Sequence, residues 1–176
     1  PINNYNVSVQ IGNYVAIQDT CLKGDQTHFM NHYVLDYNKE LASNFFPQSK
    51  EVIRFYEKYF GDYQWYEDGY KLVEVPYLGM EHQSAVTYGN GFSMYNGVRS
   101  KSWPMYGVID PLIIHETGHE WFGNSVTALD PTHIWIHEGL QVYSEAIFFE
   151  DKFDSYEVGV HYLNTLKNRI ANEIPI

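Results

Sequence analysis

Two histidines separated by three residues are the feature of this sequence with the clearest chemical meaning. The segment reads His115-Glu116-Thr117-Gly118-His119. Residues at i and i+4 of a helix lie on one face, so both imidazoles can reach a single ion at about 2.0–2.1 Å. Glu116 projects from an adjacent part of that face, where it can serve as a general base without binding the metal. The spacing predicts a catalytic zinc site held by His115 and His119.

A catalytic zinc ion needs a third protein ligand and one open position for water. Glu138 is the leading candidate, because it stands near the start of the next predicted helix. Glu145 follows two helical turns later on the same face. A metal-bound histidine usually donates its second ring N–H to a carboxylate or a carbonyl, so we expect Glu145 to accept that bond from His115 or His119. An ordinary solvated glutamate is the alternative.

Other residues near the motif carry weaker predictions. His133 and His137 form a second i, i+4 pair and are an alternative set of ligands. Glu120 points about 100° away from His119 and is predicted to be solvated or salt-bridged. The histidines expected at the surface or in hydrogen bonds are His28, His32 and His161.

The elements that would position these residues are strands in the first half of the chain and helices in the second. Hydrophobic periodicity predicts strands at residues 5–17, 29–37, 71–75 and 84–88, with loops at 18–27 and 89–107. It predicts helices at 47–60, 110–123, 136–150 and 154–171. Asp110 is the expected N-cap of the histidine helix, and Asp154 with Glu157 forms an expected capping box. Strands followed by helices favour an α+β fold.

Composition limits the classes of partner. Eleven Lys and Arg residues against 22 Asp and Glu give a net charge of −11, which makes nucleic acid a poor partner and suits amine-bearing ligands. No apolar run approaches the ~18 residues that span a membrane, and no signal peptide is evident. The single Cys21 identifies no compartment. The chain begins at Pro1, and we expect it to be a fragment of a longer protein.

The histidine motif and its flanks resemble the aminopeptidase N and leukotriene hydrolase family of zinc metallopeptidases. That family has His-Glu-x-x-His, then eighteen residues, then a ligand Glu, and here residues 120–137 separate His119 from Glu138. Residues 119–127 resemble the family's His-Gln-Trp-Phe-Gly-Asn-x-Val-Thr, and residues 135–140 resemble its Trp-Leu-Asn-Glu-Gly-Phe.

A second motif upstream resembles the family's substrate-binding Gly-Ala-Met-Glu-Asn strand. Residues 78–83 read Leu-Gly-Met-Glu-His-Gln, as in a bacterial subgroup with Gly-Met-Glu-His-Gln. The resemblance implies that Glu81 binds the free α-amino group of a peptide and that Gly79 and Met80 line its backbone. A carboxylate held at a fixed distance from the metal would leave room for only one substrate residue between the bound α-amino group and the ion. Without the resemblance, Glu81 would be interpreted as an edge-strand charge.

The resemblance also implies a domain organisation. Residues 1–20 would be the tail of a preceding β domain, and residues 21–176 the N-terminal part of a truncated thermolysin-like catalytic domain, with a small mixed sheet followed by helices that carry the zinc site. The expected partners are peptides with a free N-terminus, together with the remaining catalytic lobe and the C-terminal domains. The family's oxyanion-stabilising tyrosine lies further beyond the third ligand than this chain extends.

The expected function is a zinc-dependent aminopeptidase with one zinc ion per chain. The fragment itself is expected to be weakly active or inactive, with an exposed apolar rim formed by Trp103, Trp121 and Trp135. A thermolysin-type endopeptidase, which needs no carboxylate for an ammonium group, is one alternative. A non-catalytic binding module stabilised by zinc is the other.

Overall fold

A mixed sheet and a series of helices form the part of the chain that the computed structural model describes, residues 2–93 and 107–167. Within those ranges the sheet has five strands in the order β1-β2-β3-β5-β4. The strands are β1 (Tyr14–Lys23), β2 (Gln26–Leu35), β3 (Leu72–Glu74), β4 (Gly79–Met80) and β5 (Val86–Tyr88). The predicted α+β fold is confirmed.

The strand pairing leaves β4 at one edge of the sheet. β1 and β2 form an antiparallel hairpin, β2 pairs with β3 and β3 with β5 in parallel, and β4 runs antiparallel to β5 with Met80 opposite Thr87. Within the described residues, no strand pairs with the other side of β4. This edge strand carries the residues just before Glu81.

The hairpin overturns two predictions about the first 27 residues. The predicted loop at 18–27 belongs instead to β1, β2 and the turn at Gly24, whose φ of +57° suits glycine. The predicted strand at 5–17 is regular only from Tyr14 onwards, because the preceding residues find no sheet neighbour. They form a short 3-10 turn, η1 (Asn4–Asn6), and then an extended run whose apolar side chains are exposed.

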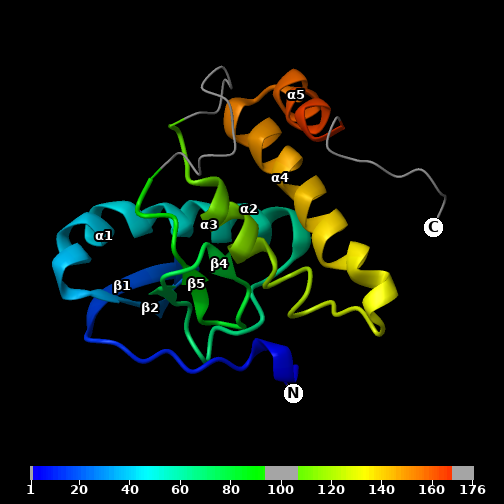
Figure 1. Cartoon of the computed structure of the whole chain (residues 1–176). Helices are drawn as coiled ribbons and strands as arrows, with labels where there is room; N and C mark the ends of the chain where they lie inside the picture. The colour runs from blue at the N-terminus through cyan, green and yellow to red at the C-terminus, as the bar shows by residue number, and fades with distance from the viewer. Residues whose placement is uncertain (1, 94–106, 168–176) are drawn as a thin grey trace.

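Five helices follow or interrupt the strands within the described residues. They are α1 (Lys39–Phe45), α2 (Ser49–Phe60), α3 (Pro111–Gly118), α4 (Glu138–Phe153) and α5 (Tyr156–Lys167). Helices α1, α2 and α3 cover one face of the sheet, and α4 leads away from it toward α5 (Figure 1). The predicted apolar stripe of α2 is buried in this layer, and Gly61 ends the helix.

Several helix boundaries differ from the sequence prediction, and α4 ends at Phe153 and not at residue 150. The Asp110 side chain accepts a hydrogen bond from the Leu112 amide at 2.8 Å, as an N-cap should, but α3 ends at Gly118 and not at residue 123. His119 is therefore its C-cap. Asp154 ends α4 in a left-handed conformation with φ of 48°, so it is not the predicted N-cap of the following helix.

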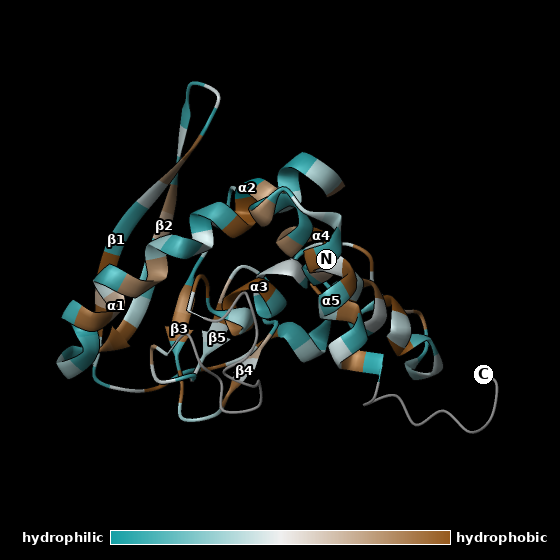
Figure 2. Ribbon diagram, turned by 90° about the horizontal axis from the view of Figure 1, so that it is seen from above, coloured by the Kyte–Doolittle hydropathy of each residue, from teal (hydrophilic) through white to brown (hydrophobic). Residues whose placement is uncertain are grey.

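Aromatic side chains make up much of the buried core. Apolar residues recur along β3 and in parts of α2 and α3 (Figure 2). Trp121 is 5% exposed and its indole N–H donates to the Gly61 carbonyl at 2.8 Å, so its predicted place on an exposed rim is wrong. Trp135 is 52% exposed, and Trp103 lies outside the described residues. Among the helices described, none is both long enough and apolar enough to cross a membrane.

Candidate metal centre and substrate cleft

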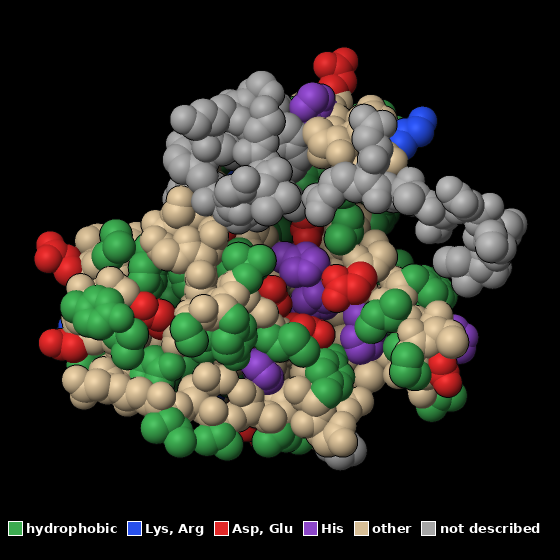
Figure 3. All heavy atoms as spheres, in the orientation of Figure 1, with side chains coloured by type: hydrophobic (Ala, Val, Ile, Leu, Met, Phe, Trp, Pro, Cys, Tyr) green, Lys and Arg blue, Asp and Glu red, His purple; other side chains and the backbone are tan. Residues whose placement is uncertain are grey.

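Helices α3 and α4 bring three potential metal ligands to one point. His115 lies in the last turn of α3, His119 caps that helix, and Glu138 begins α4. The two Nε2 atoms are 3.2 Å apart, and Glu138 Oε2 lies 3.5 Å from Nε2 of His115 and 3.8 Å from Nε2 of His119. In the space-filling view, histidine and acidic side chains gather near the centre of this face (Figure 3).

Both imidazoles have their other ring nitrogen occupied by an acceptor. Nδ1 of His119 lies 2.8 Å from the Phe122 carbonyl oxygen, which can only accept, so the proton of the neutral ring is on Nδ1. Nδ1 of His115 lies 2.6 Å from Glu145 Oε1. Each ring can therefore turn the lone pair of Nε2 toward the shared point, which is the arrangement that a metal ligand needs.

The three donor atoms fit a tetrahedral divalent ion. Ligand bonds of about 2.0–2.1 Å at tetrahedral angles separate the ligand atoms by about 3.3–3.4 Å; two of the observed spacings, 3.2 and 3.5 Å, are close to this value, and the third is 3.8 Å. Burial lowers the pKa of His115, but hydrogen bonds to Glu138 and Glu145 outweigh this effect and raise the pKa well above its ordinary value. The surroundings of this histidine thus favour a positive charge.

Glu116 is buried beside the cluster and close to the edge strand. Its side chain lies against the Gly79 backbone, where a Cβ atom at residue 79 would be 2.9 Å from Glu116 Oε1. Burial, the largest effect, raises the pKa of Glu116 to about 8. Glu81, Glu116 and His119 each offer an atom within 4.8 Å of the others. The predicted base thus lies close to one of the predicted ligands and to the predicted amino-group site.

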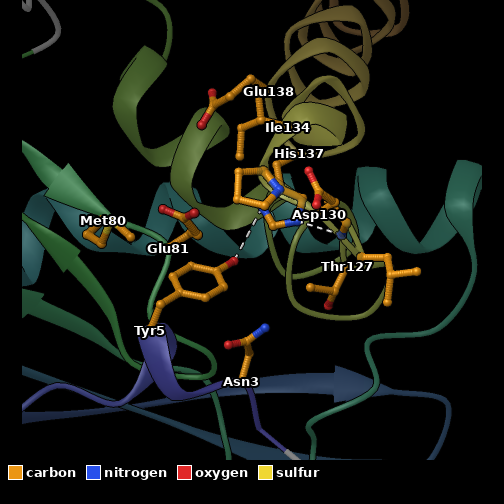
Figure 4. Close-up of a pocket in the computed structure, with 12 residues that line it drawn as sticks. Asn3, Tyr5, Met80, Glu81, Thr127, Asp130, Ile134, His137 and Glu138 are labelled. Atoms are coloured by element: carbon orange, nitrogen blue, oxygen red, sulfur yellow. Dashed lines mark hydrogen bonds between the residues drawn. The ribbon is translucent and has the colours of Figure 1, made fainter.

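A cleft of about 510 Å³ opens beside this arrangement (Figure 4). Met80 and Glu81 line one side of the cleft and Glu138 another. The Glu81 side chain faces the cleft although the residue is only 8% exposed, and its carbonyl oxygen accepts a hydrogen bond from Asn124 Nδ2 at 3.0 Å. The structure thus brings every residue predicted for the site into one region.

Other residues near the motif take different roles from those predicted. Glu120 is 1% exposed, and its Oε1 accepts from the Ser84 amide at 2.6 Å, so the prediction of a solvated or salt-bridged glutamate is wrong. His137 is buried and its Nε2 accepts from the Ala128 amide at 2.9 Å, whereas His133 is exposed. Neither belongs to a ligand cluster in the described part of the chain.

Sequence reasoning missed Tyr5. It lines the cleft from the N-terminal turn η1, and its hydroxyl lies 3.4 Å from Nδ1 of His137, a residue 132 positions away (Figure 4). The alternating pattern of residues 5–17 favoured a strand and gave no sign of this contact.

Residues 45–174 match the sequence profile of the peptidase family M1 domain. The chain belongs to peptidase family M1. This confirms the resemblance carried by the histidine motif and by the Gly-Met-Glu-His-Gln segment.

Curated relatives of the M1 chain are aminopeptidases. This chain is 30% identical over 140 residues to endoplasmic reticulum aminopeptidase 2 of Homo sapiens, and the match covers 73% of this chain and 14% of that protein. It is 29% identical over 153 residues to glutamyl aminopeptidase of Rattus norvegicus, covering 85% of this chain and 15% of the relative. The chain thus spans about a seventh of the length of these relatives.

Solved structures of M1 zinc metallopeptidases share the fold. A two-domain enzyme with an E323A substitution, bound to L-tryptophan, superposes with a TM-score of 0.64 at 18% identity, over 92% of this chain and 33% of that chain. An M1 zinc metallopeptidase from Deinococcus radiodurans gives a TM-score of 0.61 at 17% identity, over 91% and 33%. At these identities the likeness establishes the fold alone.

Proposed function

We propose that this chain is part of the catalytic domain of a zinc-dependent aminopeptidase that removes N-terminal residues from peptides. The observation that carries the proposal is the convergence of a three-ligand cluster and a buried carboxylate beside a cleft that a second carboxylate, at the edge strand, helps to line. Membership of family M1 and the named aminopeptidase relatives support it. The remaining catalytic lobe, further domains and an oxyanion-stabilising tyrosine would come from elsewhere in the complete gene product.

His115, His119 and Glu138 would hold one zinc ion per chain, and when bound the ion would supply Lewis-acid chemistry at the scissile carbonyl. Glu145 and the Phe122 carbonyl keep the two imidazoles oriented through their Nδ1 atoms. In this proposal the ligand set is neutral at the histidines and anionic only at Glu138.

Glu116 acts as the general base and then as the general acid. It accepts a proton from the attacking water and passes it to the leaving amine. The carboxylate has to be ionised for the first step, and a bound cation would counteract the burial that raises its pKa. Gly79 leaves room for this carboxylate next to the strand.

The substrate would lie as an added strand on the free edge of β4, Gly79–Met80. Its α-ammonium group would meet Glu81, which immediately follows that strand. A charge-assisted hydrogen bond in this half-closed cleft binds the N-terminus and also places the first peptide carbonyl over the cluster.

The decisive experiment compares free and N-acetylated substrates in the complete, zinc-loaded gene product. Glu81→Ala should lower kcat/KM for aminoacyl-nitroanilides by about 10–100-fold, the cost of a charge-assisted hydrogen bond, and leave the zinc content unchanged. Acetylated substrates should be poor for the wild type and little affected by the substitution. Glu67→Ala, an exposed carboxylate outside the cleft, is the matched control.

Two outcomes would favour the alternatives. Equal losses on free and acetylated substrates would move the thermolysin-type endopeptidase ahead, since Glu81 would then not recognise the amino group. A zinc-loaded complete protein that turns over neither substrate would favour a zinc-stabilised binding module.

A further inference from the structure

The N-terminal turn η1 contacts the main chain around Glu81 through one intermediary. Asn6, which is 3% exposed, donates from Nδ2 to Asn124 Oδ1 at 2.7 Å. Asn124 in turn donates from its own Nδ2 to the Glu81 carbonyl at 3.0 Å. The backbone of Glu81 is therefore tied to a segment that precedes the sheet in sequence.

The neighbouring residue of the same turn approaches the Glu81 side chain. The Tyr5 ring stacks on His137 with centroids 6.1 Å apart, and its hydroxyl lies 3.4 Å from Nδ1 of that histidine. Figure 4 shows the Tyr5 hydroxyl directed toward His137, with the Glu81 side chain beside it. The charge of the nearby Glu81 carboxylate helps to raise the pKa of the Tyr5 phenol.

The direction of the hydrogen bonds follows from a backbone amide. Because the Ala128 N–H can only donate, Nε2 of His137 must accept, and the proton of the neutral ring is on Nδ1. Nδ1–H then donates to the Tyr5 oxygen. The hydroxyl proton of Tyr5 is then left for a second acceptor, and the Glu81 carboxylate, which lines the same cleft and whose charge acts on this phenol, is the candidate. Burial, followed by the charge of Glu81, raises the pKa of Tyr5 to about 12, so the phenol keeps that proton at neutral pH.

We propose that Tyr5 is a positioning residue for substrate recognition: its hydroxyl, oriented by His137, holds the Glu81 carboxylate in the direction that receives the substrate's α-ammonium group. The inference rests on the proposed function of Glu81. A buried carboxylate needs a donor to fix its rotamer, and one oxygen held by Tyr5 leaves the other for the ligand. His137 stands where the resembling motif has Asn, and its longer ring reaches both Ala128 and Tyr5.

Tyr5→Phe tests the inference because it removes only the hydroxyl and keeps the ring stacked on His137. In the complete, zinc-loaded gene product, the ratio of kcat/KM for free over N-acetylated aminoacyl-nitroanilides should fall by about 10-fold, the effect of one hydrogen bond to a charged group. Zinc content and Tm should stay at their wild-type values. Tyr37→Phe, which removes a hydroxyl from a side chain that is 80% exposed, should leave the ratio unchanged.

A pair of substitutions at His137 separates its two contacts. In the wild type, Nδ1 of His137 faces Tyr5 and Nε2 faces Ala128. The amide of Asn would lie at the position of Nδ1, and the amide of Gln would lie at the position of Nε2. His137→Asn should therefore keep a higher free-to-acetylated ratio than His137→Gln. The opposite order would overturn the proposed direction of the hydrogen-bond chain.

The outcomes distinguish this inference from the function on which it rests. If the wild type prefers free amino groups, Glu81→Ala abolishes that preference and Tyr5→Phe leaves it intact, then the role of Tyr5 is refuted and the proposed function stands. If the wild type shows no preference at all, both are refuted. A fall in Tm or zinc content with an unchanged ratio would make Tyr5 merely structural and would also overturn the inference.

Discussion

Nδ1 of His115 lies 2.6 Å from Oε1 of Glu145, a carboxylate whose side chain is 1% exposed. The two residues belong to different helices, α3 and α4. This contact sets the orientation of one imidazole before any ion binds, and it makes α4 the source of both a potential ligand and the group that orients another ligand.

Glu145→Gln should weaken zinc binding without abolishing it. The amide keeps the size of the side chain but loses the charge that supports the His115 ring, and loss of such an outer partner typically costs about 10–100-fold in metal affinity. Competition with a chromophoric chelator would measure the change. His119→Ala should abolish binding under the same conditions, and Glu157→Gln, on the exposed side of α5, should have no effect. Wild-type affinity in Glu145→Gln would contradict the orienting role.

Glu116→Gln separates the base from the ligands. In the complete gene product the substitution should keep zinc and lower kcat on the order of 10²–10⁴-fold, the usual contribution of a positioned general base. Metal analysis on the assayed sample is the necessary companion measurement. Loss of zinc together with activity would mean that Glu116 supports the cluster structurally.

Gly118→Ala should destabilise the fold although residue 118 does not touch the cleft. A Cβ atom there would lie 2.1 Å from both the Tyr56 hydroxyl and Gln141 Oε1, which are buried and hydrogen-bonded to each other. Overpacking of this kind costs about 1–3 kcal/mol, which thermal or urea unfolding would detect. Gly139→Ala is the control, because its Cβ would meet only the Trp135 Cβ at 3.6 Å. Equal stability of the two variants would show that the Tyr56 pair can move aside.

His32 should make the fold sensitive to mild acid. Burial lowers its pKa to about 4 from 6.5, and its Nδ1 accepts from the Leu72 amide at 3.0 Å. Between these two pKa values the unfolded chain binds a proton that the folded chain does not. The contribution of neutral His32 to the free energy of unfolding is therefore fully present above pH 6.5. It falls by about 3 kcal/mol as the pH drops to about 4.

Urea unfolding with a chelator at pH 7 and pH 4.5 would test this dependence free of metal loss. His32→Asn keeps an acceptor at the level of Nδ1 and removes the titration, so its stability should change less between the two pH values. The same change in variant and wild type would assign the acid sensitivity to other groups.

Local sequence signals predicted the parts of the molecule that depend on neighbours along the chain. The apolar stripe of α2 and the Asp110 cap of α3 are of this kind, and so is the i, i+4 spacing of the two histidines. Each is decided within one or two helical turns. Glu138 and Glu145 were reachable by the same reasoning, because both lie on one face of α4.

Contacts between segments that are distant in the sequence could not be predicted from the local pattern of residues. The sequence predicts a loop at residues 18–27, which include the polar second half of β1. In the fold, Asp19 of this strand pairs with Lys50 of α2 and not with a sequence neighbour. Glu120 is buried because the Ser84 amide, 36 positions away, supplies a donor. The contact of Tyr5 with His137 follows the same rule. In each case a polar group is satisfied by an element that only the complete fold brings near.

The early end of α3 places the candidate ion between two helix termini. The C-terminal end of a helix carries a partial negative charge and the N-terminal end a partial positive one. His119 caps the negative end of α3, which suits a cation, and Glu138 begins the positive end of α4, which suits its carboxylate. These fields and the Nδ1 contacts act whether or not an ion is bound. Zinc should then bind to a site that is already formed in the metal-free protein. After removal of the metal with a chelator, the protein should regain zinc at a rate proportional to the zinc concentration. Its far-UV circular dichroism should not change during this step.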